Sequence, residues 1–247
     1  MSPEFRKKIK NVLFIDIETI AGYPAFEQMP ERLQQLWDKR ADVIRKRAEF
    51  ESWSNQDLYY EQAGISAEFG RIACIAFGGV FFNEKDEPAL KVMSFGGDKE
   101  VEILLNFKNI IERYRPDQLI LCAHNGKEFD FPYLCRRMLI NGLELPPALQ
   151  LSGKKPWEIL HQDTMELWKF GDFKAYTSLD LLAAVFGVHS SKDEMSGDQV
   201  TRVYYEEKDI EKISRYCRED VVVLTQLYLK MHLQPIIKEE NIIRVTG

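Results

Sequence analysis

The sequence of 247 residues predicts an α/β fold, in which helices flank a mixed β-sheet. Two observations lead to this prediction. Continuous apolar runs, typical of strands that are buried on both faces, alternate along the chain with segments whose apolar residues recur every three or four positions. The composition, with 45% hydrophobic residues, is sufficient for one large core and excludes a disordered or fibrous chain.

The predicted strands follow from the apolar runs. Residues 11–18, NVLFIDIE, form the first strand and end in two carboxylates. Residues 71–82 and 89–96 form two further strands, which are joined by a polar turn. Residues 118–123 and a short segment at 158–161 are predicted as strands later in the chain. Because helical segments separate some of these strands and a short turn joins others, the sheet is expected to be mixed.

Helical spacing predicts helices at 98–114 and 132–140, and then a run of helices to about residue 234. One segment interrupts the α/β order. Between the first two strands, residues 24–66 combine dense mixed charge with a helical apolar pattern, which consists of Leu33, Leu36, Trp37, Ile44 and Ala48. We therefore predict one or two amphipathic helices inserted at 24–66, within a single domain that spans residues 1–247.

Charge and cysteine content limit the class of protein. Thirty-three basic against 39 acidic residues give a net charge of −6, which argues against a broad basic surface for nucleic acid. Candidate contacts to phosphate are confined to short basic runs at 6–8, 45–47, 136–137 and 154–155, each of which is more typical of a solvated helix face or loop. No apolar run is long enough to cross a membrane, and there is no signal-peptide pattern. The scattered cysteines indicate reduced core thiols of a cytoplasmic protein, with neither a disulfide framework nor a zinc site.

The first pair of candidate functional residues is Asp16 and Glu18, at the end of the first strand. Residues two apart in a strand point to the same face, with Cα atoms about 6.6–7 Å apart. Two buried carboxylates at this separation repel each other unless a cation neutralises them, and oxygen ligands favour Mg²⁺ or Mn²⁺. The alternative is that the strand ends at Asp16 and that both side chains are solvated.

The second candidate segment is HNGKEFDFPYL at residues 124–134, between a strand and a helix. Asp130 stands just before the helix, where an acid near an ion is one interpretation. The alternative is that Asp130 caps the helix, because Asp is a favoured N-cap residue and Pro132 suits a first helical turn. Asn125 and Phe129 are then a turn residue and a core contact.

The third candidate is Asp220, which lies on the apolar stripe of the last long helix. The stripe is formed by Ile213, Tyr216, Asp220, Leu224 and Leu227. A buried acid needs a hydrogen-bonding partner or an ion, and Tyr216 stands one turn earlier on the same face. The alternative is a buried Asp220 that hydrogen-bonds to nearby backbone.

Together, FIDIET, HNGKEFDFPYL and YCRED resemble the three motifs of the DEDD superfamily of 3′–5′ exonucleases. The Y-x-x-x-D form of the last motif resembles the tyrosine-bearing (DEDDy) subgroup. The middle motif is similar to that of the proofreading exonuclease domain of family B DNA polymerases. SLDLLAAVFGV at 178–188 and the following KDEMSGDQV add to this resemblance, which covers about residues 11–232.

The resemblance implies a ribonuclease-H-like fold with a five-stranded mixed sheet. It also implies that Asp16, Glu18, Asp130 and Asp220 hold two divalent ions, Mg²⁺ or Mn²⁺. Tyr216 would then orient the attacking water. The positions of Thr19, Asn125 and Phe129 match residues that contact the terminal nucleotides.

From the resemblance we expect a metal-dependent 3′–5′ exonuclease that releases nucleoside monophosphates from single-stranded DNA. The alternatives are an exoribonuclease that trims RNA 3′ ends and a non-catalytic nucleic-acid-binding module on the same fold. Because the sequence ends soon after the third motif, we expect a stand-alone enzyme or a subunit without a polymerase domain. The 24–66 insertion is longer than the resemblance leads one to expect and offers a surface for a protein partner.

Overall fold

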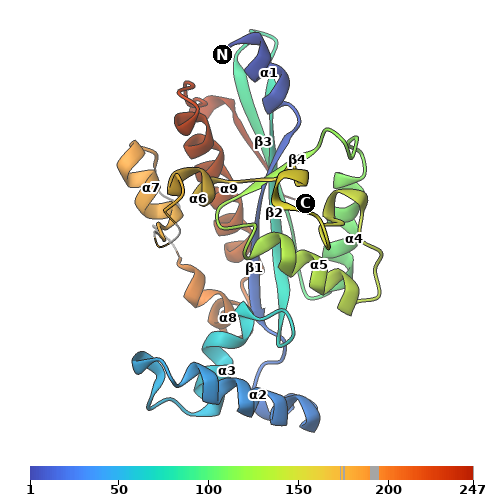
Figure 1. Cartoon of the computed structure of the whole chain (residues 1–247), viewed down its shortest axis with the longest axis vertical. Helices are drawn as coiled ribbons and strands as arrows, with labels where there is room; N and C mark the ends of the chain where they lie inside the picture. Colours follow the sequence, from blue (N-terminus) through green and yellow to red (C-terminus); the bar gives the residue numbers. More distant parts are fainter. Residues whose placement is uncertain (173, 175, 190–194, 247) are drawn as a thin grey trace.

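The structure is a computed structural model that describes residues 1–172, 174, 176–189 and 195–246. Within these residues the chain forms a mixed sheet with helices on both faces (Figure 1). The strand order is β5-β4-β1-β2-β3-β6. The prediction of an α/β fold with a mixed sheet is therefore confirmed, but the described sheet has six strands and the expectation of five was wrong.

The central strand β1 is antiparallel to β2 on one side and parallel to β4 on the other. β3 is antiparallel to β2, whereas β5 and β6 extend the two edges in parallel with their neighbours. The strands span Val12–Ala21 (β1), Gly70–Phe82 (β2), Pro88–Gly96 (β3), Ile120–Ala123 (β4), Gln162–Asp163 (β5) and Ile242–Thr246 (β6).

Two edge strands differ from the sequence prediction. β6 was not predicted, because a five-residue run after the last helix acquires its pairing with β3 only from the tertiary fold. The short strand predicted at 158–161 lies instead at Gln162–Asp163. His161 is buried, and its ring Nδ1 accepts a hydrogen bond of 3.2 Å from the backbone N–H of Leu121 in β4.

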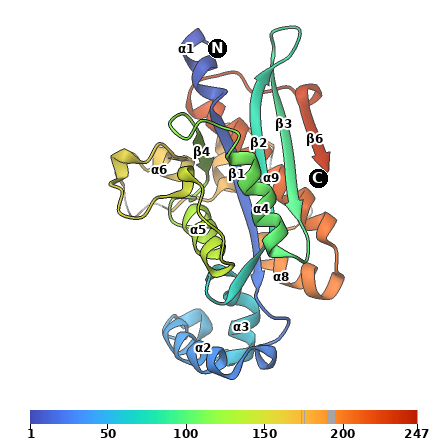
Figure 2. The ribbon, with the colours of Figure 1, turned by 90° about the vertical axis from the view of Figure 1, so that its right-hand side faces the viewer.

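Helices α9 (Ile210–Met231) and α7 (Leu179–Phe186) lie on one side of the sheet, and α4 (Glu100–Ile111) and α5 (Asp130–Ile140) lie on the other (Figures 1 and 2). Strand β1 contributes to two cores in alternation. Phe14 packs in the core beneath α9, whereas Ile15 packs in the core beneath α4 and α5.

Outside the insertion, shorter helical segments are α1 (Pro3–Ile9), α6 (Thr164–Lys169), α8 (Val200–Arg202) and a π-helical turn at Val203–Glu207. α1, which we did not predict from the sequence, begins at a Ser2 cap whose Oγ accepts from the backbone N–H of Phe5. In the described part of the chain, no helix combines the length and apolar character needed to cross a membrane. Residues 192–194, which begin the segment KDEMSGDQV, lie outside the described residues.

The insertion between β1 and β2 contains two helices, α2 (Glu31–Ile44) and α3 (Asn55–Gln62), as the periodicity predicted. It has a small core of its own, in which the ring of Trp37 packs edge-on against Tyr59 with centroids 5.3 Å apart. Trp37 also donates a hydrogen bond of 3.0 Å to the backbone of Asn55 and thereby joins α2 to α3.

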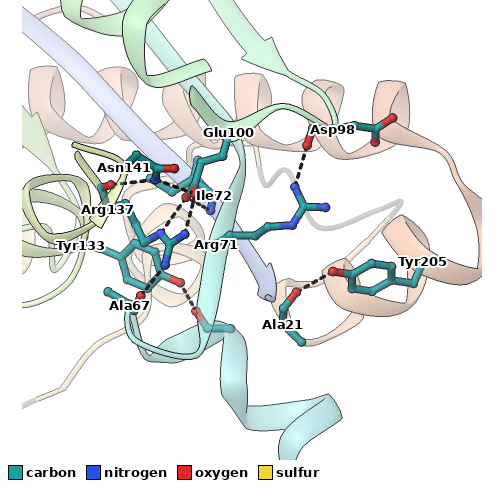
Figure 3. Close-up of polar contacts among 11 residues, drawn as sticks. Ala21, Ala67, Arg71, Ile72, Asp98, Glu100, Tyr133, Arg137, Asn141 and Tyr205 are labelled. Carbon is teal, nitrogen blue, oxygen red and sulfur yellow. Dashed lines mark hydrogen bonds and ion pairs between the residues drawn. The ribbon is translucent and has the colours of Figure 1, made fainter. Parts of the chain in front are cut away.

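Both ends of the insertion are hydrogen-bonded to the body of the domain (Figure 3). At its beginning, Tyr205 of the π-helical turn donates to the carbonyl of Ala21 over 2.7 Å. At its end, Tyr133 of α5 donates to the carbonyl of Gly64 over 2.9 Å. Since elements from opposite faces of the sheet hold the two ends, the insertion has a defined position next to the end of β1.

Candidate active site

The candidate site lies along an edge of β1 that its neighbouring strand leaves uncovered. β4 ends at Ala123 and pairs with β1 only from Val12 to Phe14. Beyond Phe14, β1 continues to Ala21 with no strand paired on this side in the described structure. Main-chain groups and side chains of the second half of β1 are therefore accessible to loops and helices that follow β4.

Asp16 and Glu18 both point toward α9. The strand alternation shows this, since Phe14 and Ile20 belong to the core beneath α9, whereas Ile17 belongs to the core on the opposite face. Glu18 is buried, with 7% of its surface exposed. The register of β1 and β2 shifts between Glu18 and the following residue, and such bulges often occur beside functional sites, where they reorient side chains.

Helix α9 supplies three side chains to these acids: Tyr216, Cys217 and Asp220. The Tyr216 hydroxyl donates a hydrogen bond to the Asp220 carboxylate. The Cys217 thiol lies 3.3 Å from Oδ2 of Asp16. One ligand atom from each of Asp16, Glu18 and Cys217 lies within 4.8 Å of the other two. The stripe on α9 that was predicted from sequence therefore faces the two acids of β1.

Asp130 approaches from the opposite side, as the first residue of α5. Its carboxylate accepts hydrogen bonds from its own backbone N–H and from that of Ile17 on β1. The N-cap residue of α5 is Phe129, and no side chain caps this helix. The interpretation of Asp130 as an N-cap is thus wrong: its side chain, 4% exposed, lies against the uncovered edge of β1.

The four acids form one electrostatic cluster. Burial, followed by the charges of Asp220 and Asp130, raises the pKa of Asp16 well above its usual range. Burial and the same neighbours, together with Asp16, raise the pKa of Glu18. Burial is also the largest cause that raises the pKa of Asp130 to about 7. A cation between these groups would offset both their mutual repulsion and their loss of hydration.

Within the cluster, Asp16 and Glu18 lie in a compact group with Cys217, and Asp130 and Asp220 lie farther out. Among the described residues, the compact group of ligand atoms within 4.8 Å includes neither Asp130 nor Asp220. Both are nevertheless close enough for their charges to raise the pKa of Asp16. Tyr216 stays protonated as a hydrogen-bond donor, because burial and the neighbouring carboxylates raise its pKa above the usual range of a phenol.

The three residues predicted to contact substrate, Asn125, Phe129 and Thr19, lie in different surroundings. Asn125 lies in the turn after β4 and has a positive φ of 61°, a conformation that Asn tolerates better than most residues. Phe129 lies next to Asp130, and its ring centroid is 5.3 Å from that of Tyr133. Thr19 points to the face opposite Glu18, where its hydroxyl donates to that of Tyr133.

Asp163, for which the sequence indicates a helix cap, has a role beyond capping. Its carboxylate caps α6 by accepting a hydrogen bond from the backbone N–H of Met165. It also accepts from the N–H groups of Asn125 and Lys127, over 2.9 and 3.1 Å. Asp163 therefore fixes the turn that leads to Asp130. The sequence signal for this role, a lone acid after a short strand, is too common to be specific.

The prediction of a reduced core thiol is confirmed for Cys217, which is free and fully buried, but its contact with the Asp16 carboxylate was not predicted. Its position directly after Tyr216 and three residues before Asp220 was the available signal. Some residues of the basic runs have internal partners: Arg6 pairs with Asp86, and Arg137 pairs with Glu100 over 2.6 Å.

The mixed sheet and its flanking helices place the chain in the ribonuclease-H-like class of α/β proteins. Across 90% of its length the chain resembles the family B DNA polymerase of the archaeon Pyrobaculum calidifontis, with a TM-score of 0.53 and 16% sequence identity. Residues 65–243 match the family described as a predicted 3′–5′ exonuclease related to the exonuclease domain of PolB. This match covers well over half of the sequence, and the chain belongs to that family.

Curated relatives include archaeal DNA polymerases. DNA polymerase 1 of Pyrococcus abyssi is 28% identical over 154 residues, which are 58% of this chain and 19% of the polymerase. The DNA polymerase of Pyrococcus glycovorans is 23% identical over 164 residues, which are 60% of this chain and 20% of the polymerase. The chain thus corresponds to about a fifth of each relative, and to 24% of the Pyrobaculum calidifontis chain. The family match begins after β1, so Asp16 and Glu18 lie outside it.

Proposed function

We propose that residues 1–247 form a single metal-dependent 3′–5′ exonuclease domain of the tyrosine-bearing (DEDDy) subgroup, which removes nucleotides from the 3′ ends of single-stranded DNA. The observation that carries this proposal is the convergence of acids from β1, α5 and α9 on one uncovered strand edge, next to a tyrosine. Membership of the exonuclease family supports the same reaction class.

Asp16, Glu18, Asp130 and Asp220 are proposed to hold two divalent ions, Mg²⁺ or Mn²⁺. Their oxygen atoms are the ligands that these ions prefer, and the raised pKa of Asp16 reflects a local excess of negative charge that cations would relieve. When bound, a pair of such ions lowers the pKa of a water molecule and stabilises negative charge on the leaving oxygen.

Tyr216 is proposed to position the attacking water. Its hydroxyl is held by Asp220 and, with its raised pKa, stays protonated at neutral pH. A phenol in this state orients a water molecule through a hydrogen bond and does not act as a base. This role requires only that the ring of Tyr216 keeps its place one turn before Asp220 on α9.

The substrate end is proposed to lie beside the turn after β4. Phe129 offers an aromatic face on which a terminal base can stack, an interaction worth about 1–3 kcal/mol per base and tolerant of sequence. Asn125 lies in the same turn and has polar groups for the terminal nucleotide. The role predicted for Thr19 stays a prediction, as does activity without a polymerase domain. DNA is favoured over RNA because the relatives are DNA polymerases.

The experiment that tests this function uses 3′- and 5′-labelled single-stranded DNA and RNA with Mg²⁺ or Mn²⁺. The wild-type chain is compared with Asp16→Ala and with Asp117→Asn, a control that changes an exposed acid whose ion pair is with Arg115. We expect 5′-labelled DNA to shorten stepwise with the wild type and the control, and to stay intact with Asp16→Ala.

Three outcomes would contradict the proposal. Intact substrates with every metal would exclude the activity, and fragments that arise from the 5′ end would exclude the polarity. Equal cleavage by Asp16→Ala would exclude the assigned site. Preference for RNA would keep the reaction and replace the substrate.

A further inference from the structure

The thiol of Cys217 is the group at the site that the proposed exonuclease reaction does not use. Cys217 is fully buried on α9 and donates to the Asp16 carboxylate, with Sγ 3.3 Å from Oδ2. A second thiol adjoins it, because Cys74 of β2 pairs with Glu18 in the strand register and contacts Cys217. Two acids and a thiol therefore meet at one point of the fold.

The separation between Cys217 and Asp16 is close to that of two ligands that share one ion. In a tetrahedral zinc site with Zn–S near 2.3 Å and Zn–O near 2.0 Å, the sulfur and oxygen atoms lie about 3.5 Å apart. The distance from Cys217 Sγ to Asp16 Oδ2 is 3.3 Å, and the third ligand atom, from Glu18, lies within 4.8 Å of both. An ion shared by the three groups would require the Glu18 carboxylate oxygen to lie about 3.5 Å from the other two ligand atoms.

The chemistry of the ligands then selects the ion. Mg²⁺ prefers oxygen ligands only, whereas a thiolate favours Zn²⁺ and related soft ions, which also bind more tightly in general. A metal ion that binds a thiol displaces its proton, so each bound ion releases one proton from Cys217 to the solvent as the sulfur–metal bond forms.

We propose that Asp16, Glu18 and Cys217 form a mixed oxygen–sulfur site for a thiophilic divalent ion such as Zn²⁺. Such an ion occupies Asp16 and Glu18 and thereby excludes the Mg²⁺ or Mn²⁺ that the proposed exonuclease requires. Thiophilic metal ions are therefore expected to inhibit the exonuclease by binding at this site. The inhibition rests on the proposed function, but ion binding through the thiol does not.

The experiment uses Co²⁺ as a spectroscopic substitute for Zn²⁺, added to the full chain in the absence of oxygen and of added thiols. Coordination by a thiolate produces a charge-transfer band in the near ultraviolet that oxygen ligands do not produce. In the wild type we expect a band whose intensity corresponds to one bound thiolate per chain, and we expect Zn²⁺ to abolish it. Cys217→Ser should show no such band. Cys135→Ser is the control, since Cys135 lies on α5 and donates to the carbonyl of Leu149.

The affinity for Zn²⁺ is expected to fall at least tenfold in Cys217→Ser, because even the loss of an outer partner of a metal ligand costs about 10–100-fold. Calorimetry in two buffers is expected to show that the wild type releases about one more proton per Zn²⁺ than Cys217→Ser, because any protons displaced from Asp16 and Glu18 are common to both proteins. If Cys217→Ser fails to fold, the Co²⁺ charge-transfer band of the wild type and of Cys135→Ser still tests the inference, since its absence from both would overturn it.

Failure of the inference and failure of the proposed function are separable. Mg²⁺-dependent hydrolysis without a Co²⁺ charge-transfer band would overturn the inference alone and leave Cys217 as a hydrogen-bond donor to Asp16. A band that persists in Cys217→Ser would also overturn it, by assigning the thiolate to another cysteine. The band without any hydrolysis would support the inference and count against the exonuclease.

Discussion

Two buried glutamates, Glu18 and Glu100, are equally exposed at 7% and have opposite surroundings. Glu100 on α4 receives a charged partner in Arg137, at 2.6 and 2.9 Å, and hydrogen bonds from Asn141 and the backbone N–H of Ile72 (Figure 3). The neighbours that raise the pKa of Glu18 are carboxylates and a thiol. Burial of an acid is therefore not by itself a sign of function. The sign is burial among like charges, whose repulsion a bound cation would offset.

The Glu100 network is expected to be structural. Glu100→Ala leaves the guanidinium of Arg137 buried without its charged partner, and the loss of one member of a buried pair typically costs about 3–5 kcal/mol. We expect a decrease of this size in the free energy of unfolding, measured by urea denaturation at 25 °C. Metal binding by the protein that remains folded should be unchanged. If Glu100→Ala were as stable as the wild type, the structural role of Glu100 would be contradicted.

In the acid cluster, unlike the Glu100 network, removal of one charge is not expected to destabilise the fold. Asp16→Asn removes one of the mutually repelling charges, so the melting temperature in the presence of a chelator should rise or stay constant. Addition of Mn²⁺ at about 100 times its dissociation constant should stabilise the wild type by about 2.7 kcal/mol and the variant by much less. Calorimetric melting with and without Mn²⁺ measures both effects. A variant that is destabilised in chelator would show that Asp16 stabilises the fold.

Asp163 is an intermediate case, since it is 3% exposed and its carboxylate is satisfied by backbone N–H groups. Asp163→Ala removes a helix cap and a turn contact, which should lower the free energy of unfolding by about 0.5–2 kcal/mol. Because the same carboxylate holds the turn that leads to Asp130, we expect the Michaelis constant for DNA to increase. Asp163→Asn, which keeps one acceptor oxygen, should recover part of both losses. A change in stability without any change in substrate binding would limit Asp163 to the cap.

Prediction from the sequence succeeded where the pattern is local. The alternation in NVLFIDIE placed Asp16 and Glu18 on one face of a strand, and the helical spacing placed Tyr216 and Asp220 on one stripe. The two helices of the insertion were also predicted from periodicity. These features depend on residues within one or two turns of each other, so a single stretch of sequence contains the information.

The tertiary structure decided the features that depend on distant partners. Asp130 looked like a helix cap because nothing nearby in the sequence shows that β4 ends early and exposes the edge of β1. β6 and the contact between Cys217 and Asp16 join residues far apart in the chain, as do the hydrogen bonds from Tyr133 and Tyr205 that hold the insertion. The sequence by itself determined which acids belong together on each element. Only the packing of α5 and α9 against β1 brought those acids within reach of one another. Contacts between elements that are far apart in the chain leave no periodic pattern in the sequence, so they could not be predicted from it.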